Sequence, residues 1–232
     1  MKPIAIVNKI ISAEAETTLK QYADIVRFDT IDITFSPLSG HIDIFAFPYK
    51  NKLILAPNFP EEYIALFEKH DVEYCFGNTN IGTDKKSINA YNVATNNDIA
   101  IHNFAVTDQV VLDNINHLKP IHCKQSFSRC STLLLANSAI TSDGGIFKQL
   151  TSHGYNCLLV SQTDIQLPGY RNGCFGGCCG ILGNTVFVNG SLSFHKQGSV
   201  IKDFIHDGGY EIVELQASPL VDVGSIFFLG DF

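Results

Sequence analysis

The sequence feature that most constrains the fold is one pattern of predicted elements that recurs along the chain. Each copy has two short apolar runs around a turn, then a helical stretch, then a further apolar run. The clearest copy is SRCSTLLLANSAITSD (residues 128–143), which ends at a predicted helix N-cap, Asp143. The turn asparagines Asn51, Asn97, Asn137 and Asn184 are spaced by 46, 40 and 47 residues. Repetition at this period predicts a repeat architecture.

The two ends of the chain supply a fifth copy of the pattern. Residues 225–229 form a predicted first strand, and residues 3–7, 13–22 and 24–28 form the strand, helix and strand that would follow it. Pairing of the ends would close a ring and remove exposed sheet edges. We therefore expect an α/β fold, a five-fold pseudo-symmetric α/β propeller in a single domain spanning 1–232. The expected units are 1–38 with 222–232, 39–80, 81–126, 127–170 and 171–221.

The internal copies predict specific strands and helices. The predicted first strands are 44–47, 90–94, 132–135 and 181–182, and the predicted second strands are 53–56, 99–101, 139–141 and 185–188. Predicted helices cover 61–69, 108–117, a stretch around 146–150, and 199–206, and the predicted third strands cover 72–76, 120–124, 155–160 and 210–215.

Composition limits the classes of partner. A net charge of −7, with Lys85-Lys86 as the one visible basic cluster, argues against a nucleic-acid surface. No apolar run approaches the roughly 18 residues of a membrane helix. The N-terminal apolar stretch is too short for a signal peptide, so we expect a cytoplasmic protein. The partner we expect is a small-molecule ligand, with no nucleic acid and no membrane. The 7 cysteines are expected to be reduced, with Cys75, Cys123 and Cys157 buried as small apolar side chains.

The loops that enter the first strands carry the candidate site residues. In a closed ring, the loops at 39–43, 87–92, 128–132, 176–180 and 222–225 would meet at a common axis. His41 and Asp43 are two apart, which on a strand places both on one face. A carboxylate beside an imidazole can orient it as a general base. The alternative interpretation is an exposed loop pair.

Cys130 is the candidate nucleophile. It lies between Arg129 and Ser131, and a neighbouring cation favours the reactive thiolate. The alternative is a buried structural thiol. Asp222, at the head of the last strand, is a candidate for binding a cationic group, or it caps a turn. The remaining candidate ligand-binding residues are Asn92, Arg129, Ser131, Cys178 and Ser225.

The segment at 173–180, GCFGGCCG, has the most unusual local composition. Its glycines suggest close approach of the backbone to a neighbouring group, or positive φ angles. The spacing C-x3-C-C does not match paired C-x2-C zinc motifs. We therefore expect no metal and no cofactor, while a zinc site that joins these cysteines to His41 or Cys130 stays an open alternative.

Five strand–strand–helix–strand units in a ring resemble the pentein, or guanidine-modifying-enzyme, superfamily. The phrases SGHIDI, RCSTLLLANSAITSD, LPGY and DVGSIFFL are similar to an uncharacterised bacterial family of this fold. The resemblance implies a central polar pocket in which a Cys and a His act on guanidino compounds. That superfamily also includes arginine deiminases, amidinotransferases and a non-catalytic ribosome anti-association factor.

The sequence departs from the enzymes of this superfamily at their catalytic positions. Gly224-Ser225 stand where the resemblance implies the nucleophilic Cys, and Cys178-Cys179 stand where it implies the His. Two functions are therefore carried forward. The first is a divergent hydrolase or transferase for a guanidino or amidine compound, with Cys130 as nucleophile, His41 and Asp43 as acid/base pair and Asp222 as cation ligand. The alternative is a non-catalytic ring that binds a ligand or partner, so whether the chain is an enzyme stays open.

Overall fold

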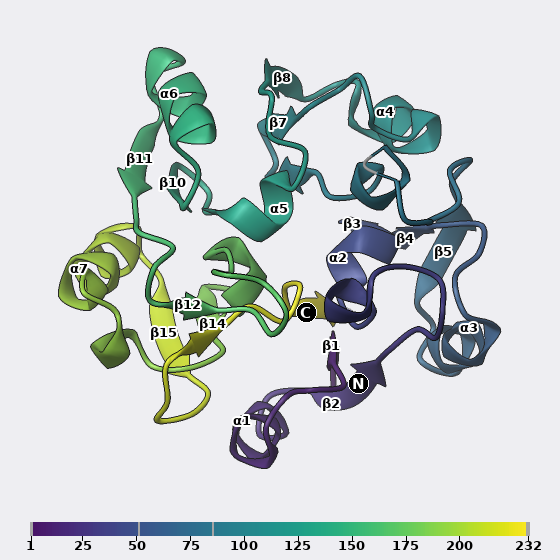
Figure 1. Cartoon of the computed structure of the whole chain (residues 1–232), viewed down its shortest axis with the longest axis horizontal. Coiled ribbons are helices and arrows are strands. Elements are labelled where there is room, and N and C mark those ends of the chain that lie inside the picture. Colours follow the sequence, from purple (N-terminus) through teal and green to yellow (C-terminus); the bar gives the residue numbers. More distant parts are fainter. Residues whose placement is uncertain (1, 51, 85, 231–232) are drawn as a thin grey trace.

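The computed structural model describes residues 2–50, 52–84 and 86–230, and it shows a mixed α/β fold. Figure 1 shows small sheets set around a common centre, with helices on the outside. Of the turn asparagines used above, Asn51 lies outside the described residues. Within those residues, no helix is both long and apolar enough to cross a lipid bilayer.

Five three-stranded sheets share one strand arrangement. In each, the middle strand is antiparallel to the first strand and parallel to the third. The sheets, in the order first, middle and third strand, are β17 (Phe227–Leu229), β1 (Ile4–Asn8) and β2 (Asp24–Phe28); β3 (Ala46–Tyr49), β4 (Lys52–Leu55) and β5 (Glu73–Phe76); β6 (Ala94–Thr95), β7 (Ile99–His102) and β8 (Lys119–His122); β9 (Thr132–Leu134), β10 (Ser138–Thr141) and β11 (Asn156–Leu159); and β13 (Cys179–Leu182), β14 (Thr185–Val188) and β15 (Glu211–Glu214).

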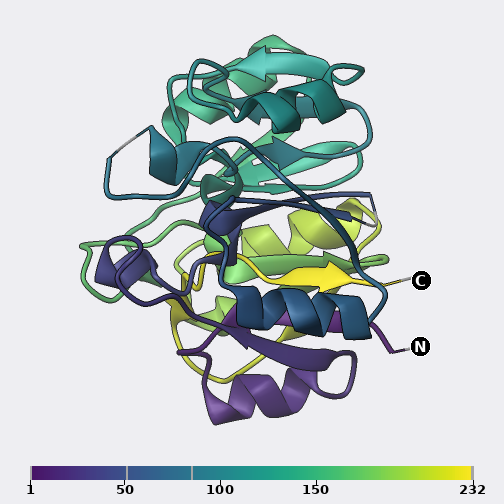
Figure 2. The same cartoon turned by 90° about the vertical axis from the view of Figure 1, so that its right-hand side faces the viewer.

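The two ends of the chain pair as the repeat pattern predicts. Strand β17 is antiparallel to β1, with Ile4 opposite Leu229 and Ile6 opposite Phe227. Both termini lie on the same side of the molecule in Figure 2. A further two-stranded sheet joins β12 (Ile165–Gln166) to β16 (Leu220–Val221) in parallel, and no repeat signal predicted it.

One helix connects the middle and third strands of each sheet. These helices are α1 (Ala13–Leu19), α3 (Glu61–Lys69), α4 (Gln109–Ile115), α6 (Gly144–Ser152) and α7 (Gly198–Asp207). The predicted N-cap Asp143 accepts hydrogen bonds from the backbone N–H groups of Gly145 and Ile146, which have no partner within the helix. Phe28, Phe45, Phe47 and Phe67 are fully buried in one apolar cluster that links neighbouring sheets.

The segments before the first strands are short helical turns, which corrects two predicted strands. Residues Ile42–Phe45 form α2 instead of the start of a strand, and the predicted strand at 90–94 is reduced to Ala94–Thr95 after the turn η2 (Ser87–Asn89). His41, Ile42, Asp43 and Ile44 alternate polar and apolar residues as a strand would, but all four residues of α2 are buried, including Asp43, so the alternation here does not indicate an exposed strand face. Similar turns, α5 (Ser128–Ser131) and η3 (Gly176–Cys178), precede β9 and β13, and the remaining turns are η1 (Ser36–Leu38) and η4 (Leu192–Phe194).

His102 at the end of β7 should make stability depend on pH. Its ring is buried, with Nε2 2.8 Å from the Ser126 carbonyl oxygen and Nδ1 2.6 Å from Thr107 Oγ1. Burial lowers the pKa of His102 to about 4. Because the unfolded chain takes up this proton near pH 6.5, stability is present above that pH and is lost as the pH falls towards 4. The expected loss is about 3 kcal/mol.

Urea unfolding at a series of pH values from 7 to 4.5 measures this effect. His102→Asn should be less stable at pH 7 but should show a shallower decline with falling pH. His206→Asn changes an exposed ring and should keep the wild-type pH dependence. An unchanged pH dependence in His102→Asn would contradict the assignment.

Candidate functional site

The turns before the first strands are bonded to one another around the centre of the molecule. The Asp43 N–H donates to the Gly224 carbonyl, and the Ser225 N–H donates to the Gly177 carbonyl. On the other side of Asp43, the Asn92 side chain donates to the Asp43 carbonyl, and the Arg129 N–H donates to the Asn92 carbonyl. Segments far apart in the sequence are thereby held side by side, and their polar side chains meet.

Asp43 lies at the centre of this polar cluster. Its Oδ2 accepts hydrogen bonds from the Cys130 thiol at 2.9 Å and from the Ser225 hydroxyl at 2.8 Å. Asn92 Nδ2 lies 3.2 Å from Cys130 Sγ, and Asn92 Oδ1 accepts from the Cys130 N–H. Cys130, Asn92 and Ser225 are all buried. The candidate nucleophile is therefore fixed by a carboxylate and an amide.

His41 and Asp222 form the second part of the cluster. His41 Nδ1 lies 4.0 Å from Asp222 Oδ1, and both side chains are buried. Asp222 accepts from the Cys174 and Gly224 backbone N–H groups. Neither ring nitrogen of His41 has a hydrogen-bond partner among the described residues, and neither has Asp43 Oδ1. His41 is the residue that precedes α2, so His41 and Asp43 meet through a helical turn and not through the strand face predicted from their spacing.

Glycines make room for these side chains, as the composition of the segment predicts. A Cβ on Gly177 would lie 2.0 Å from Asp222 Oδ1, and a Cβ on Gly224 would lie 2.4 Å from His41 Cα. Gly224 and Ser225 have φ angles of 75° and 67°, so the chain turns here in the left-handed region. Because of this turn, β17 begins at Phe227, two residues after the predicted first residue, Ser225. It also presents the Ser225 hydroxyl to Asp43.

Burial sets the protonation of the cluster. Loss of hydration raises the pKa of Cys130 well above the usual thiol range, and the nearby Asp43 and Asp222 charges raise it further. Burial also raises the pKa of Asp43 and raises that of Asp222 to about 6, while it lowers the pKa of His41. In the ligand-free protein Cys130 is therefore a neutral thiol and His41 a neutral imidazole. The Arg129 charge attracts the Cys130 thiolate, but burial of Cys130 outweighs this attraction in setting the pKa of the thiol.

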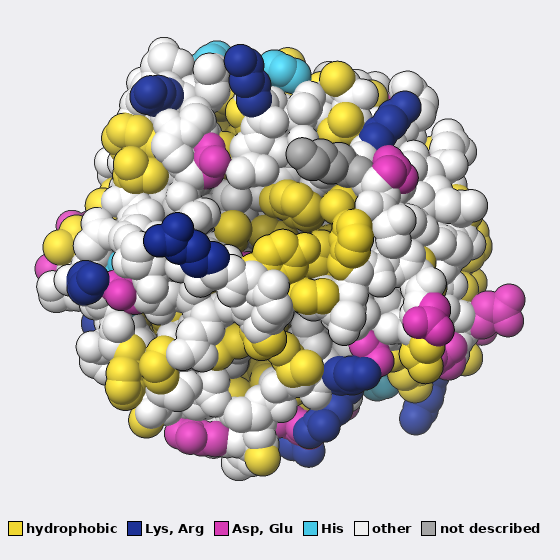
Figure 3. All heavy atoms as spheres, in the orientation of Figure 1, with side chains coloured by type: hydrophobic (Ala, Val, Ile, Leu, Met, Phe, Trp, Pro, Cys, Tyr) yellow, Lys and Arg dark blue, Asp and Glu magenta, His cyan; other side chains and the backbone are white. Residues whose placement is uncertain are grey.

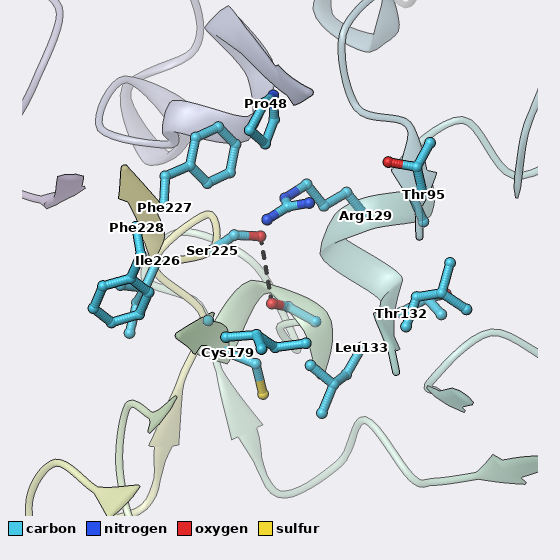
Figure 4. Close-up of a pocket in the computed structure, with 15 residues that line it drawn as sticks. Pro48, Thr95, Arg129, Thr132, Leu133, Cys179, Ser225, Ile226, Phe227 and Phe228 are labelled. Carbon is cyan, nitrogen blue, oxygen red and sulfur yellow. Dashed lines mark hydrogen bonds between the residues drawn. The ribbon is translucent and has the colours of Figure 1, made fainter. Parts of the chain in front are cut away.

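Arg129 lines a pocket at the centre of the molecule. Its guanidinium carbon lies 4.5 Å from the centre of the Phe227 ring. Figure 4 shows its side chain reaching toward Ser225 and Phe227. The first strand of every three-stranded sheet contributes to the lining of this pocket of about 200 Å³, through Pro48, Thr95, Leu133, Ile181 and Phe227. Ser225 lies at the boundary of the pocket and the polar cluster, since its hydroxyl bonds to Asp43.

Two of the predicted site residues lie at the edge of the cluster. The Ser131 hydroxyl is 3.8 Å from Cys174 Sγ, and the Cys178 thiol donates to the Cys174 carbonyl. The Cys179 thiol likewise donates to the Phe175 carbonyl. Within the described residues, none of these three thiols belongs to a group of three metal-ligand atoms within 4.8 Å of one another.

The structure thus brings His41, Asp43, Asn92, Cys130, Asp222 and Ser225 together, and it places Arg129, Ser131 and Cys178 around them. Cys174, which the sequence analysis considered only as part of a possible zinc site, is also a neighbour of the cluster. Its thiol faces Ser131 and Gln162, and burial beside Asp222 raises the pKa of that thiol to about 12. Its place in the Gly/Cys-rich segment was the signal available in the sequence.

Comparison with known proteins identifies the sequence family of the chain and solved structures with a similar fold. The sequence model of a family described as "Family of unknown function (DUF6873)" matches residues 6–227. No curated protein matches the chain. Among solved structures, a DDAH from Pseudomonas aeruginosa complexed with citrulline is similar, with a TM-score of 0.54, 8% identity, and 92% of each chain covered.

Two other solved enzymes have similar structures. An agmatine deiminase from C. jejuni with substrate bound has a TM-score of 0.56 at 12% identity, covering 91% of this chain and 77% of the other. An amidinotransferase from Microseira wollei, in the saxitoxin biosynthetic pathway, has a TM-score of 0.51 at 9% identity, with 93% and 88% covered. These similarities confirm the predicted resemblance to the fold of the pentein superfamily. At such low identity they concern the fold alone.

Proposed function

The chain belongs to the family of unknown function DUF6873, and from its buried cluster we propose that it is a hydrolase or transferase acting on a small guanidino or amidine compound. The observation that carries the proposal is the contact of 2.9 Å between Cys130 Sγ and Asp43 Oδ2, beside His41. A nucleophile in hydrogen-bond reach of a base, with a second acid/base group nearby, is the arrangement that covalent catalysis needs.

The proposal includes a closed ring of five units, formed by a single domain. The pairing of β1 with β17 supports the closure. The pocket lined by all five first strands supports a common axis. The site would then lie on that axis, where each unit contributes a short polar turn.

Two buried carboxylates favour a cationic substrate. Asp43 and Asp222 are both buried. Within the described residues, the one ion pair that either of them makes is the 4.0 Å contact of Asp222 with His41. A planar amidinium or guanidinium cation presents several N–H groups, and two carboxylates can accept hydrogen bonds from them. Its charge would also lower the pKa of the Cys130 thiol, because an opposite charge nearby favours the thiolate. Substrate binding would thereby activate a thiol that is inert in the ligand-free protein.

The reaction begins with attack of Cys130 Sγ on the central carbon of the cation, and the thiol proton passes to Asp43 Oδ2. The carbon–nitrogen bond to the leaving amine then breaks, and the amine takes up that proton. His41 next removes a proton from water, or from the amine of a second substrate, which attacks the same carbon. The carbon–sulfur bond breaks, and the thiolate takes up the proton held by His41, which restores the thiol and the neutral imidazole. Water gives a hydrolase, and an amine acceptor gives a transferase.

Access to the buried cluster requires movement of a covering segment. The loop at 167–172 follows β12 in the chain and packs against η1. A Cβ built on Gly169 in this loop would lie 2.5 Å from Pro37 Cγ. Figure 2 shows this loop projecting on the side away from the two termini. Figure 3 shows apolar side chains gathered in a hollow near the middle of that face. Opening of such a loop admits substrate, and its closure excludes water from the reaction.

The alternative function is a non-catalytic ring that binds a ligand. The observation that favours it is the burial of Asp43 and of Cys130, whose thiol is neutral in the ligand-free protein. In this alternative, Arg129 and the axial pocket bind the ligand, and the polar cluster serves to hold the turns together.

Turnover of a panel of compounds tests the proposal. Purified protein is incubated with small guanidino and amidine compounds, with and without an amine acceptor. Released ammonia or amine and the new product are measured by mass spectrometry. The proposal expects turnover of at least one cationic compound and none of its neutral urea or amide analogue. Ligand binding without turnover across the panel would favour the non-catalytic ring.

A further inference from the structure

His41 and Asp43 contain buried polar atoms without partners. His41 is 1% exposed and Asp43 is 0% exposed. Both His41 ring nitrogens and Asp43 Oδ1 lack hydrogen-bond partners among the described residues. Leaving such groups unpaired in a protein interior costs about 1–3 kcal/mol each. An unpaired group of this kind indicates a bound species that satisfies it.

The unpaired atoms belong to a set of metal-ligand type. One nitrogen of His41, one oxygen of Asp43 and Cys130 Sγ all lie within 4.8 Å of one another. Each comes from a short turn that is anchored by backbone hydrogen bonds, so the ligand atoms are held in place before an ion arrives. Asp222 Oδ1, 4.0 Å from His41 Nδ1, offers a fourth ligand atom, the second oxygen of the set.

We infer that His41, Asp43 and Cys130 form a binding site for a divalent transition-metal ion of the zinc type. Imidazole nitrogen, carboxylate oxygen and thiolate sulfur are the three donor types that zinc combines in proteins. The mixture excludes hard cations such as Mg²⁺ and Ca²⁺, which prefer oxygen ligands alone. Asp222 or water completes the four-coordinate shell.

Binding of the ion changes the bonding of Cys130. The sulfur–metal bond forms as the thiol proton leaves to solvent, so one proton is released for each ion bound. The hydrogen bond from Cys130 to Asp43 is replaced by two bonds to the same ion. Asn92 Nδ2, 3.2 Å from the sulfur, stays as a donor to the thiolate and orients it.

The inference does not rest on the proposed turnover. The ion and a cationic substrate would use the same carboxylate and the same sulfur, so one excludes the other. Zinc binding without turnover would overturn the proposed function alone. Turnover without zinc binding would overturn the metal site alone.

Titration of the full chain with metal tests the inference. Protein freed of metal by a chelator is titrated with ZnCl₂ by calorimetry in two buffers of different ionisation enthalpy. We expect one ion per chain and release of one proton per ion. Titration with CoCl₂ should produce the charge-transfer absorption band of a cobalt–thiolate bond in the near ultraviolet.

Variants assign the ligands. Cys130→Ser should abolish the cobalt–thiolate band, and His41→Gln should weaken zinc binding at least about 100-fold. Cys157→Ser removes a thiol of β11, outside the cluster, and should leave both signals unchanged. Circular dichroism checks that each variant is folded. Absence of the band in the wild-type protein, or its persistence in Cys130→Ser, would overturn the site. The wild-type spectrum decides the question even if a variant does not fold.

Discussion

Replacement of Cys130 by alanine is expected to reduce turnover of the cationic substrate by at least about 10³-fold. The substitution removes the sulfur that would form the bond to the substrate carbon, while Asp43, Ser225 and His41 stay in place. The lost hydrogen bond to Asp43 costs stability, but Asp43 keeps its bond from Ser225. The fold should therefore persist. The measurement is the rate of product formation at saturating substrate, with circular dichroism as the test of folding.

A matched control separates the nucleophile from general thiol effects. Cys157→Ala removes a half-buried thiol on β11 and should keep the full rate. Cys130→Ser is a second variant, because a hydroxyl keeps the contact with Asp43 but is a far weaker nucleophile. A Cys130→Ala protein that retains more than about a tenth of the wild-type rate would remove Cys130 from the mechanism.

Replacement of Gly224 by alanine is expected to destabilise the protein by about 3 kcal/mol or more. The new Cβ would lie 2.4 Å from His41 Cα, Cβ and Cγ, and the backbone there cannot move without shifting α2. The φ angle of 75° adds a cost for any residue with a side chain. Because the overlap displaces His41, metal binding and turnover should both fall. Urea unfolding gives the free energy of unfolding.

Gly154 supplies the control for Gly224. Its φ angle is 82°, but no atom lies within 4 Å of a Cβ built on it. Gly154→Ala should therefore lower the free energy of unfolding by only about 1 kcal/mol, the cost of placing a side chain at a positive φ angle, and should leave the site intact. Equal destabilisation by the two substitutions would show that the close approach of Gly224 to His41 is not present in solution.

The repeated elements were predictable because their sequence signals are local. Helix α3 spans the predicted residues Glu61–Lys69, and β14 spans the predicted Thr185–Val188. Antiparallel pairing of β1 with β17 was predictable as well, although the paired residues Ala5 and Phe228 are 223 positions apart (228 − 5), because only closure leaves neither chain end with an unpaired strand. Such signals arise from periodicity, turn residues and caps, all of which act over a few residues.

The turns at the centre were predictable in location but not in shape. Residues 42–45 and 128–131 are buried at nearly every position, so the polar/apolar pattern of their sequence does not separate a buried face from an exposed one and misleads where it alternates, as at His41 to Ile44. The protonation state of the Cys130 thiol could not be predicted from the sequence either. Arg129 adjoins Cys130 in sequence, but its side chain turns to Phe227, and the groups that face the thiol are Asp43 and Asn92. Contacts of this kind depend on the tertiary fold and cannot be deduced from neighbours in the chain.

The central claim is that Cys130 and Asp43 form one site for a cationic carbon electrophile. Chloroacetamidine and chloroacetamide have the same size and leaving group, but only the first is a cation at neutral pH. We expect chloroacetamidine to modify Cys130 about tenfold faster or more, because the charged hydrogen bonds to Asp43 are worth about 1.5–3 kcal/mol. Peptide mass spectrometry of the wild-type and Asp43→Asn proteins over time gives both rates. Equal rates for the two reagents, or modification of Cys174 or Cys179 while Cys130 stays free, would contradict the account.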